Sequence, residues 1–315
     1  VPVGTAARLA ELVHEKVPDA ILAWNPEFLR EGFAVEDTLH PDRLVYGLPE
    51  GDDASTAHAL LDEVYARIVA DGTPKVVTDY ATAEMVKTAA NSFLATKISF
   101  INAMAELCEA TGADVKQLAD AIGYDDRIGR KFLNAGLGFG GGCLPKDIRA
   151  FMARAGELGA DQALTFLREV DNINMRRRIR MVELAREVCD GSLLGKRIAV
   201  LGAAFKPNSD DIRDSPALNV AAQLQLQGAT VRVADPAAIE NCRKMWPQLD
   251  YADSPEDAAE RADAVLLLTE WQQYRDLDPV AFGRVVRQKR VLDGRNALDR
   301  TRWEAAGWSY RALGR

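Results

Sequence analysis

The sequence is poor in cysteine and has no long hydrophobic run. Its four cysteines, Cys108, Cys143, Cys189 and Cys242, lie far apart and form no C-x-x-C pair. This spacing argues against a disulfide framework or a zinc site and favours a reducing compartment. No stretch of about 18 apolar residues occurs, so we expect no membrane-spanning helix. The expected location is the cytoplasm.

Metal-ligand spacing and an excess of positive charge are also lacking. The three histidines, His14, His40 and His58, share no spacing typical of a metal site, so we expect no bound metal. With 47 acidic and 39 basic residues, the net charge of −8 argues against a nucleic-acid or anionic-membrane surface. The remaining composition is ordinary for a globular protein, and a length of 315 residues suggests about two domains.

The two strand-rich parts of the chain lack the Gly-x-Gly-x-x-Gly turn that holds a dinucleotide. In the first part, strands are predicted at 20–24, 43–47 and 75–78, with helices at 5–17 and 54–70. This is the rhythm of the second half of a doubly wound sheet. A second sheet of the same kind is predicted from strands at 196–202, 229–236, 264–269 and 290–295. Its ligand is therefore not expected to be held by the usual glycine turn, although a nucleotide remains plausible.

Between these parts, one long helix is predicted from Thr82 to about Thr111, where neither proline nor glycine occurs. Its apolar stripe comprises Leu94, Ile98, Ile101, Ala105 and Cys108. Extended backwards, the stripe reaches Asn91 and Lys87. A lysine in line with a buried face is either functional or reaches water from the start of the helix. Further helices are predicted at 114–122 and 161–190, and the Arg176–Arg178 triplet of the latter is expected to be a solvated face.

The most unusual stretch is Gly138-Phe139-Gly140-Gly141-Gly142-Cys143-Leu144-Pro145-Lys146-Asp147. Pro145 fits the first turn of a helix that continues to Arg154, so Cys143 is predicted to lie where a glycine loop enters a helix. The free N–H groups and partial positive charge of a helix start favour the thiolate, which is the nucleophilic form. The alternative is a glycine turn with a small buried cysteine.

Several segments, in this order and at this spacing, resemble the UDP-glucose 6-dehydrogenase family of nucleotide-sugar dehydrogenases. They are Asn25–Glu31, Lys87 with Asn91, Arg127–Gly129, Phe132–Gly136, Gly138–Asp147 and Phe205–Arg213. The resemblance implies an α/β fold of two doubly wound (Rossmann-like) domains, the first truncated, joined by a long helix and a helical central dimerisation domain. The implied boundaries are 1–80 for the NAD-binding remnant, 81–190 for the central domain and 191–315 for the UDP-binding domain.

The resemblance also concerns the front of the chain, which starts at Val1 without methionine. Members of the family begin with a strand and a Gly-x-Gly-x-x-Gly turn that hold NAD, within a segment of roughly 100 residues that we expect to precede Val1. We therefore expect this chain to bind NAD poorly or not at all, and the intact gene product to be the enzyme.

The activity implied by the resemblance is a four-electron oxidation of UDP-glucose to UDP-glucuronate with NAD as cofactor. In this family a cysteine, here Cys143, carries the sugar as a thiohemiacetal and then as a thioester. Lys87 and Asn91 are implied to donate to the oxygen at C6, Asp147 to act as a base or to orient water, and Glu27 to assist thioester hydrolysis. For Glu27, as for Glu31, the alternative is a loop carboxylate in a salt bridge.

The implied substrate contacts come from several loops. They are Phe28, Leu29, Arg30, Phe132, Leu133, Asn134, Ala135, Gly136, Gly140, Lys206 and Arg295, together with Arg127, which in the family reaches the neighbouring subunit's site. Glu31, Lys146 and Arg213 resemble residues on the cofactor side. Lys206 and Arg295 could instead be surface cations on loops. A homodimer is implied, and the competing functions are a GDP-mannose 6-dehydrogenase and a noncatalytic nucleotide-sugar-binding dimer module.

Overall fold

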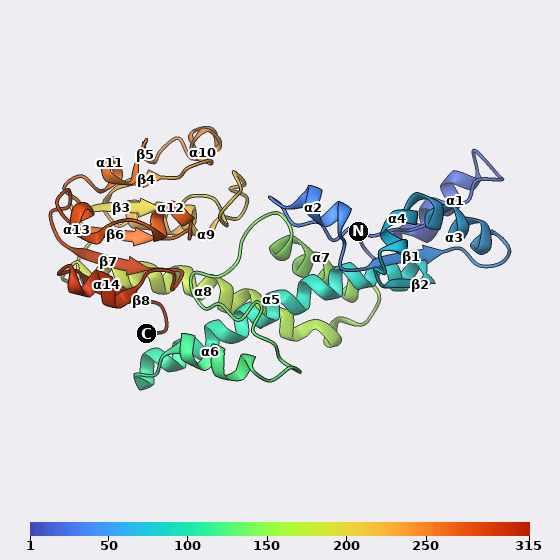
Figure 1. The fold of residues 1–315 in the computed structure, drawn as a ribbon, viewed down its shortest axis with the longest axis horizontal. Coiled ribbons are helices and arrows are strands. Elements are labelled where there is room, and N and C mark those ends of the chain that lie inside the picture. The colour runs from blue at the N-terminus through green and yellow to red at the C-terminus, as the bar shows by residue number, and fades with distance from the viewer. The chain divides into compact units, whose positions relative to one another are not determined.

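The computed structural model describes residues 1–315, and the chain divides into two compact units, which are described separately. Unit 1 comprises Val1–Phe93 and Asp147–Thr165, and unit 2 comprises Leu94–Lys146 and Phe166–Arg315. Two helices, α5 (Tyr80–Thr111) and α7 (Leu144–Glu157), each contribute residues to both units (Figure 1). The predicted long helix and the predicted helix after Cys143 are both present.

Unit 1 is built on a βαβ element. Strands β1 (Leu44–Leu48) and β2 (Lys75–Asp79) pair in parallel, and α3 (Asp53–Val64) and α4 (Ala66–Ala70) connect them. Every residue of β1 is buried, and Tyr46 and Ala57 belong to the small core between β1 and α3. The unit also contains α1 (Thr5–His14) and α2 (Ala34–Leu39). The helix predicted at 54–70 is therefore present, but it is interrupted at Tyr65.

The strand predicted at 20–24 is wrong. Only Trp24 pairs with the sheet, through an isolated antiparallel bridge to Gly47 whose two N–H···O bonds are both 2.7 Å long. Pro26, two residues later, has no N–H with which to extend such a ladder. The apolar run 20–24 is only half-buried, so it packs as an irregular segment instead of forming a buried strand.

Unit 2 contains a six-stranded parallel sheet with the order β5-β4-β3-β6-β7-β8. The strands are β3 (Arg197–Leu201), β4 (Thr230–Ala234), β5 (Asp250–Ala252), β6 (Ala264–Leu267), β7 (Arg290–Asp293) and β8 (Ser309–Ala312). This is the order of a doubly wound sheet, in which ligands bind beyond the carboxyl ends of the strands where the order reverses, here between β3 and β6. The sequence predicted all of these strands except β5 and β8.

Apolar cores cover both faces of this sheet. One core joins α8 (Thr165–Val188) and α9 (Pro216–Leu226) to the strands, and the other contains the aromatic residues Phe282, Trp303 and Trp308. α9 begins as its residues suggest, because the Ser215 hydroxyl accepts from the N–H of Leu218 and Pro216 is the first helical residue. The shorter helices are α10 (Ile239–Met245), α11 (Pro255–Ala259), α12 (Gln272–Arg275), α13 (Pro279–Phe282) and α14 (Arg300–Ala305).

Within unit 2, α5 packs on α6 (Val115–Gly123) through a buried cluster that includes Ile101, Ala105 and Cys108. These residues belong to the predicted apolar stripe of the long helix. A single 3-10 turn, Asp161–Leu164, belongs to unit 1 and precedes α8. None of the helices combines the length and apolar character that a membrane crossing requires.

The expectation that Arg176–Arg178 form a solvated face is wrong for two of the three arginines. Arg177 is 0% exposed and Arg178 is 2% exposed, whereas the side chain of Arg176 is 46% exposed. Each buried arginine has an acidic partner, since Arg177 pairs with Glu109 at 3.0 Å and Arg178 pairs with Asp214 at 2.9 Å. Their partners lie far away in the sequence, which is why the local pattern did not reveal their burial.

Candidate active site

In unit 1, Lys87 on α5 forms an ion pair with Glu27 of the loop before α2. The second oxygen of Glu27 accepts from the N–H of Leu29 at 2.7 Å, which fixes the loop carboxylate. Lys87 is the eighth residue of α5 and its side chain is 30% exposed. Its ammonium is thus paired with Glu27, and the side chain remains partly exposed to water. Glu27 does form a salt bridge, but with the lysine of the candidate site.

One turn further along α5, Asn91 donates from its side-chain amide to Asp147 of α7 at 2.7 Å. Residues four apart lie on the same face of a helix, so the pairs Lys87–Glu27 and Asn91–Asp147 are neighbours on one face of α5. Unit 1 thus brings together four side chains that the sequence predicted for catalysis. Their roles remain predictions.

The segment around Phe28 and Arg30 is held by its own charged residues. The guanidinium of Arg43 stacks on the Phe28 ring with 3.7 Å to the ring centre. Arg30 forms a paired hydrogen bond with Asp37, with a shortest distance of 2.6 Å. The following residue, Glu31, is half-buried in a turn. The backbone of this loop, which is expected to contact substrate, is therefore fixed by interactions within unit 1.

In unit 2, Cys143 directly precedes α7, as the glycine–proline pattern predicted. It is exposed, whereas Cys108, Cys189 and Cys242 are all buried. The alternative interpretation of a small buried cysteine is therefore wrong. An exposed thiol at the start of a helix is the arrangement that a reactive cysteine requires.

The glycines before Cys143 allow the loop to lie very close to its neighbours. Gly138 has a φ of 91° and its backbone lies against the Asn174 amide, where a Cβ atom would overlap it. Gly141 has a φ of 84° and packs under the Phe205 ring, 2.8 Å from the position of a Cβ atom. Both features require glycine. The Cys143 loop is thus packed directly against α8 and against the segment after β3.

That segment carries Arg213, whose guanidinium packs against the backbone of Gly142, next to Cys143. The N–H of Gly141 donates to the carbonyl of Arg213 at 2.8 Å. The side chain of Arg213 is 68% exposed and pairs with Asp211 at 2.8 Å. Lys206, earlier in the segment, places its ammonium 5.4 Å from the centre of the Phe205 ring. Unit 2 therefore places two predicted ligand-binding cations on the segment that supports the cysteine loop.

Asp235, which follows β4, is a buried residue that the sequence analysis missed. Its carboxylate accepts from the N–H of Ala203 at 2.7 Å, from the N–H of Ala204 at 3.0 Å and from the Trp271 indole at 3.1 Å. In dinucleotide-binding sheets, an acid at the end of the second strand binds the ribose. Here that acid holds the segment after β3, in agreement with the absence of a glycine turn from this sheet.

Arg295, after β7, forms hydrogen bonds with three different loops. It donates to the carbonyls of Leu268 at 2.7 Å, Gly138 at 2.8 Å and Phe205 at 3.4 Å, and its side chain is only 12% exposed. It is therefore not a free surface cation. Its Nε also lies 3.4 Å from the Glu270 carboxylate, and two of the five N–H donors of the guanidinium lie outside the three hydrogen bonds named.

The remaining predicted residues lie on the same unit but in different surroundings. In the Phe132–Gly136 segment, Leu133, Ala135 and Gly136 are buried, and the N–H of Gly136 donates to Asn102 at 2.8 Å. Arg127 is 89% exposed and pairs with Asp125 at 2.6 Å. Asn134 and Lys146 are exposed and Phe132 is 40% exposed. Arg127 is therefore a surface residue of its own chain.

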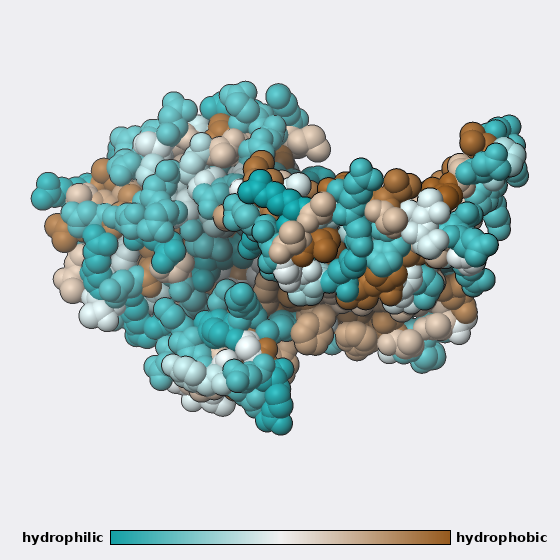
Figure 2. Space-filling view, turned by 45° about the vertical axis from the view of Figure 1, so that its right-hand side comes forward, coloured by the Kyte–Doolittle hydropathy of each residue, from teal (hydrophilic) through white to brown (hydrophobic).

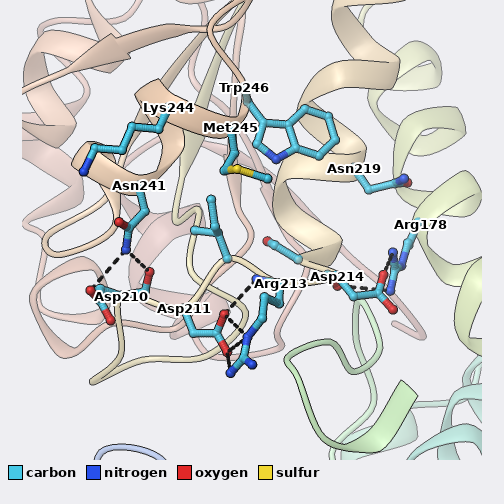
Figure 3. Close-up of a pocket in the computed structure, with 12 residues that line it drawn as sticks. Arg178, Asp210, Asp211, Arg213, Asp214, Asn219, Asn241, Lys244, Met245 and Trp246 are labelled. Carbon is cyan, nitrogen blue, oxygen red and sulfur yellow. Dashed lines mark hydrogen bonds and ion pairs between the residues drawn. The ribbon is translucent and has the colours of Figure 1, made fainter. Parts of the chain in front are cut away.

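A cavity of about 540 Å³ borders the Arg213 segment (Figure 3). It is lined by Arg178, Asp210, Asp211, Ile212, Arg213, Asp214, Ser215, Asn219, Asn241, Lys244, Met245 and Trp246. Figure 3 shows the Arg213–Asp211 and Arg178–Asp214 pairs in its wall. The segment that carries Arg213 thus contacts the cysteine loop and also borders open space.

Comparison with known proteins gives matches over the whole chain. Models of the UDP-glucose/GDP-mannose dehydrogenase family match residues 1–69 (NAD binding domain), 81–176 (central domain) and 199–300 (UDP binding domain). The UDP-glucose 6-dehydrogenase of Rhizobium meliloti is 41% identical over 317 residues, covering 100% of this chain and 72% of the relative. A Bacillus subtilis UDP-glucose 6-dehydrogenase is 41% identical over 323 residues, covering 100% of this chain and 67% of the relative.

A solved structure is similar over the same extent. The UDP-glucose dehydrogenase of the hyperthermophilic archaeon Pyrobaculum islandicum superposes with a TM-score of 0.88 at 38% sequence identity. The match covers 100% of this chain and 69% of that chain. The doubly wound architecture expected from the sequence is therefore that of a solved nucleotide-sugar dehydrogenase.

Proposed function

The chain belongs to the UDP-glucose/GDP-mannose dehydrogenase family, and we propose that it oxidises UDP-glucose at C6 to UDP-glucuronate with NAD as cofactor. The observation that carries this proposal is the exposed thiol of Cys143, at the start of α7 and next to the cation Arg213. The choice of UDP-glucose rests on the relatives, because both proteins compared above are named UDP-glucose 6-dehydrogenases.

The residues of this chain fit an NAD-dependent reaction. The family model of the NAD binding domain matches residues 1–69, which contain strand β1 and helix α3 of unit 1. The exposed Arg213 beside Gly142 is a cation of the kind that diphosphates bind, and we assign Glu31 and Lys146 to the same side of the site. Bound NAD accepts a hydride in each of the two oxidations.

Cys143 makes the second oxidation possible. The C6 alcohol first loses a hydride and a proton and becomes an aldehyde, which has no good second hydride to give. The Cys143 thiolate adds to the aldehyde carbon, and the new C–S bond gives a thiohemiacetal whose remaining C6 hydrogen can leave as hydride. Water then attacks the resulting thioester, the C–S bond breaks, and thiolate and carboxylate are released. The sum consumes one water and releases two hydrides and three protons.

The pairs Lys87–Glu27 and Asn91–Asp147 stabilise the charge and transfer the protons of these steps. Negative charge develops on the C6 oxygen in each step, and we assign Lys87 and Asn91 as its donors. Asp147, which Asn91 holds at 2.7 Å, is the base or water-orienting group. Glu27, fixed by Lys87 and by the N–H of Leu29, assists thioester hydrolysis.

We further propose that residues 1–80 belong to the NAD-binding domain, 81–190 to the central domain and 191–315 to the UDP-binding domain. Lys206 and the two remaining donors of Arg295 bind the uridine diphosphate, because phosphates favour lysine charges and arginine forks. The sugar contacts come from the Phe132–Gly136 segment and Gly140, and from the backbone of Phe28 and Leu29. Arg30, held by Asp37, shapes the latter loop.

Substrate profiling of the full-length protein tests the choice of nucleotide. We expect two NADH per UDP-glucose consumed, and at least about tenfold lower kcat/KM with GDP-mannose, a discrimination of about 1.4 kcal/mol. Higher kcat/KM with GDP-mannose would reassign the substrate. Binding of UDP-glucose in calorimetry without any NADH formation would instead favour the noncatalytic module. The expectation that residues 1–315 bind NAD poorly or not at all stays a prediction for the same calorimetry.

We also propose a homodimer that forms through α5. Phe100 and Leu107 lie seven residues apart on this helix and are 48% and 58% exposed, which is the spacing of a helix-packing seam. Exposed apolar residues of this kind appear brown in Figure 2. In such a dimer the exposed Arg127 could reach the partner's site. Leu107→Glu should give monomers in sedimentation velocity, whereas Leu226→Glu, at a residue that is 85% exposed on α9, should not. A monomeric wild-type protein would contradict the proposal.

The proposed location is the cytoplasm, because an exposed nucleophilic thiol must stay reduced. Fractionation of the source cells tests it, and recovery of the protein outside the cytoplasmic fraction would contradict it.

A further inference from the structure

Asn174 and Arg178 of α8 hold the cysteine loop by its backbone. The side-chain amide of Asn174, which is 0% exposed, accepts from the N–H of Phe139 at 2.7 Å and donates to the carbonyl of Phe139 at 2.9 Å. These two hydrogen bonds resemble those between paired strands. They satisfy both the N–H and the carbonyl of Phe139, which is buried. Phe139 lies four residues before Cys143.

Arg178 lies one helical turn after Asn174 and connects the loop to the Arg213 segment. Its guanidinium donates to the carbonyl of Phe139 at 3.2 Å, to the Asp214 carboxylate at 2.9 Å and to the Asp214 carbonyl at 3.4 Å. Figure 3 shows this arginine pointing at Asp214, the residue after Arg213. Arg178 therefore bridges the loop that presents the thiol and the segment that presents the ligand-binding cation.

The arrangement fixes geometry more than it stabilises the fold. Arg178 is 2% exposed, and its Nε–H is buried without a partner. Burying a charged group costs free energy that a single ion pair recovers only in part, and a buried donor left without an acceptor adds to that cost. Well-packed apolar residues could have joined α8 to the loop at a lower cost. Apolar packing is not directional, however, and would not fix the position of the loop as these hydrogen bonds do.

We propose that Asn174 and Arg178 are positioning residues, which set the Cys143 loop relative to the Arg213 segment so that the thiolate can capture the aldehyde before it escapes. The proposal rests on the function proposed above for Cys143. The helix α8 carries none of the residues predicted for the site. The proposal nevertheless makes α8 determine whether the aldehyde goes on to the second oxidation. Misplacement of a reacting group by about 1 Å can lower a rate by about 10²-fold.

Arg178→Lys is the main test, because lysine keeps the charge near Asp214 but loses the fork that spans both loops. We expect the first oxidation to continue while the aldehyde escapes and can be trapped by a hydrazine, so that NADH formed per sugar consumed falls from two towards one. UDP-glucuronate formation should fall by about 10- to 100-fold. A stoichiometry of two NADH with no trapped aldehyde would overturn the proposal.

Alkylation of the thiol without substrate or NAD gives a second readout. Cys143 is the exposed cysteine of the chain, so the fast-reacting thiol of the native protein reports on it. A thiol moved away from the helix start and from the Arg213 guanidinium loses the positively charged surroundings that favour its reaction, so Arg178→Lys and Asn174→Asp should each react at least about threefold more slowly. A rate equal to or above wild type in both variants would contradict the proposal, even if UDP-glucose were not the substrate.

Arg177→Lys is the matched control. Arg177 is the preceding residue of the same helix, is equally buried, and binds Glu109 and the carbonyl of Gly136. We expect it to lower the melting temperature as much as Arg178→Lys does, while the NADH stoichiometry and the alkylation rate stay at wild-type values. Equal changes in both readouts for Arg177→Lys would show a general loss of stability and would overturn the positioning role.

Discussion

A Cys143→Ser variant of the full-length enzyme should lose UDP-glucuronate formation by about 10³-fold or more. A serine hydroxyl is a far poorer nucleophile towards an aldehyde than a cysteine sulfur is. The first hydride transfer does not need the sulfur, so some NADH should still form with aldehyde as the product. Parallel assays of NADH and UDP-glucuronate measure this.

Cys242→Ser is the control for this substitution. Burial raises the pKa of the Cys242 thiol to about 12, so this cysteine keeps its proton near neutral pH and cannot act as the nucleophile. We expect Cys242→Ser to retain two NADH per sugar. UDP-glucuronate formation by Cys143→Ser at a rate within about tenfold of wild type would remove Cys143 from the mechanism.

The second large effect is expected for Lys87→Met. Methionine resembles lysine in length but carries no charge, so the C6 oxygen loses its cationic donor and Glu27 loses its ion-pair partner. Removing one such donor from an oxyanion site lowers kcat by about 10²- to 10³-fold. Initial rates of NADH formation measure this, with KM expected to change far less than kcat because the charge develops mainly in the transition state.

Lys75→Met controls for the loss of a lysine ion pair in the same unit. Lys75 bonds both oxygens of Asp62 at 2.7 Å and lies on β2, outside the residues assigned to the site. It should cost stability while kcat stays within about twofold. If Lys87→Met kept kcat within tenfold of wild type, the Lys87–Glu27 pair would be structural.

Much of the candidate site could be predicted because its signals are local. The position of Cys143 before a helix followed from neighbouring glycines and Pro145, and the shared face of Lys87 and Asn91 followed from helical spacing. Both features need only a few consecutive residues. The long helix was also predictable, because its range contains neither proline nor glycine, and the predicted range 82–111 lies within the observed Tyr80–Thr111.

The rest depended on contacts between residues that are distant in the sequence. The burial of Arg178 depends on Asp214, 36 residues away, and that of Arg177 on Glu109, 68 residues away. Without these partners in view, three consecutive arginines look like a solvated surface. Asp235 was missed for a similar reason, since its partners Ala203 and Ala204 donate through backbone N–H groups that carry no sequence signal.

The failure at residues 20–24 has a different cause. An apolar run predicts burial, but a strand also needs a partner along its length, and only Trp24 finds one at Gly47. The short elements β5, β8 and α10–α14 have three to seven residues each, too few for a periodic pattern to stand out. Local propensity was therefore a sound guide for long elements and for the cysteine turn, and a poor one elsewhere.

Whether the sugar passes through a covalent bond to Cys143 is tested most directly by peptide mass mapping of a Glu27→Gln variant, acid-quenched during turnover with UDP-glucose and NAD. Slower thioester hydrolysis should let the intermediate accumulate. We predict that the peptide containing Cys143 gains the mass of the UDP-glucuronyl group and loses it on treatment with hydroxylamine. An unmodified Cys143 peptide in a sample that is producing UDP-glucuronate would contradict the covalent route.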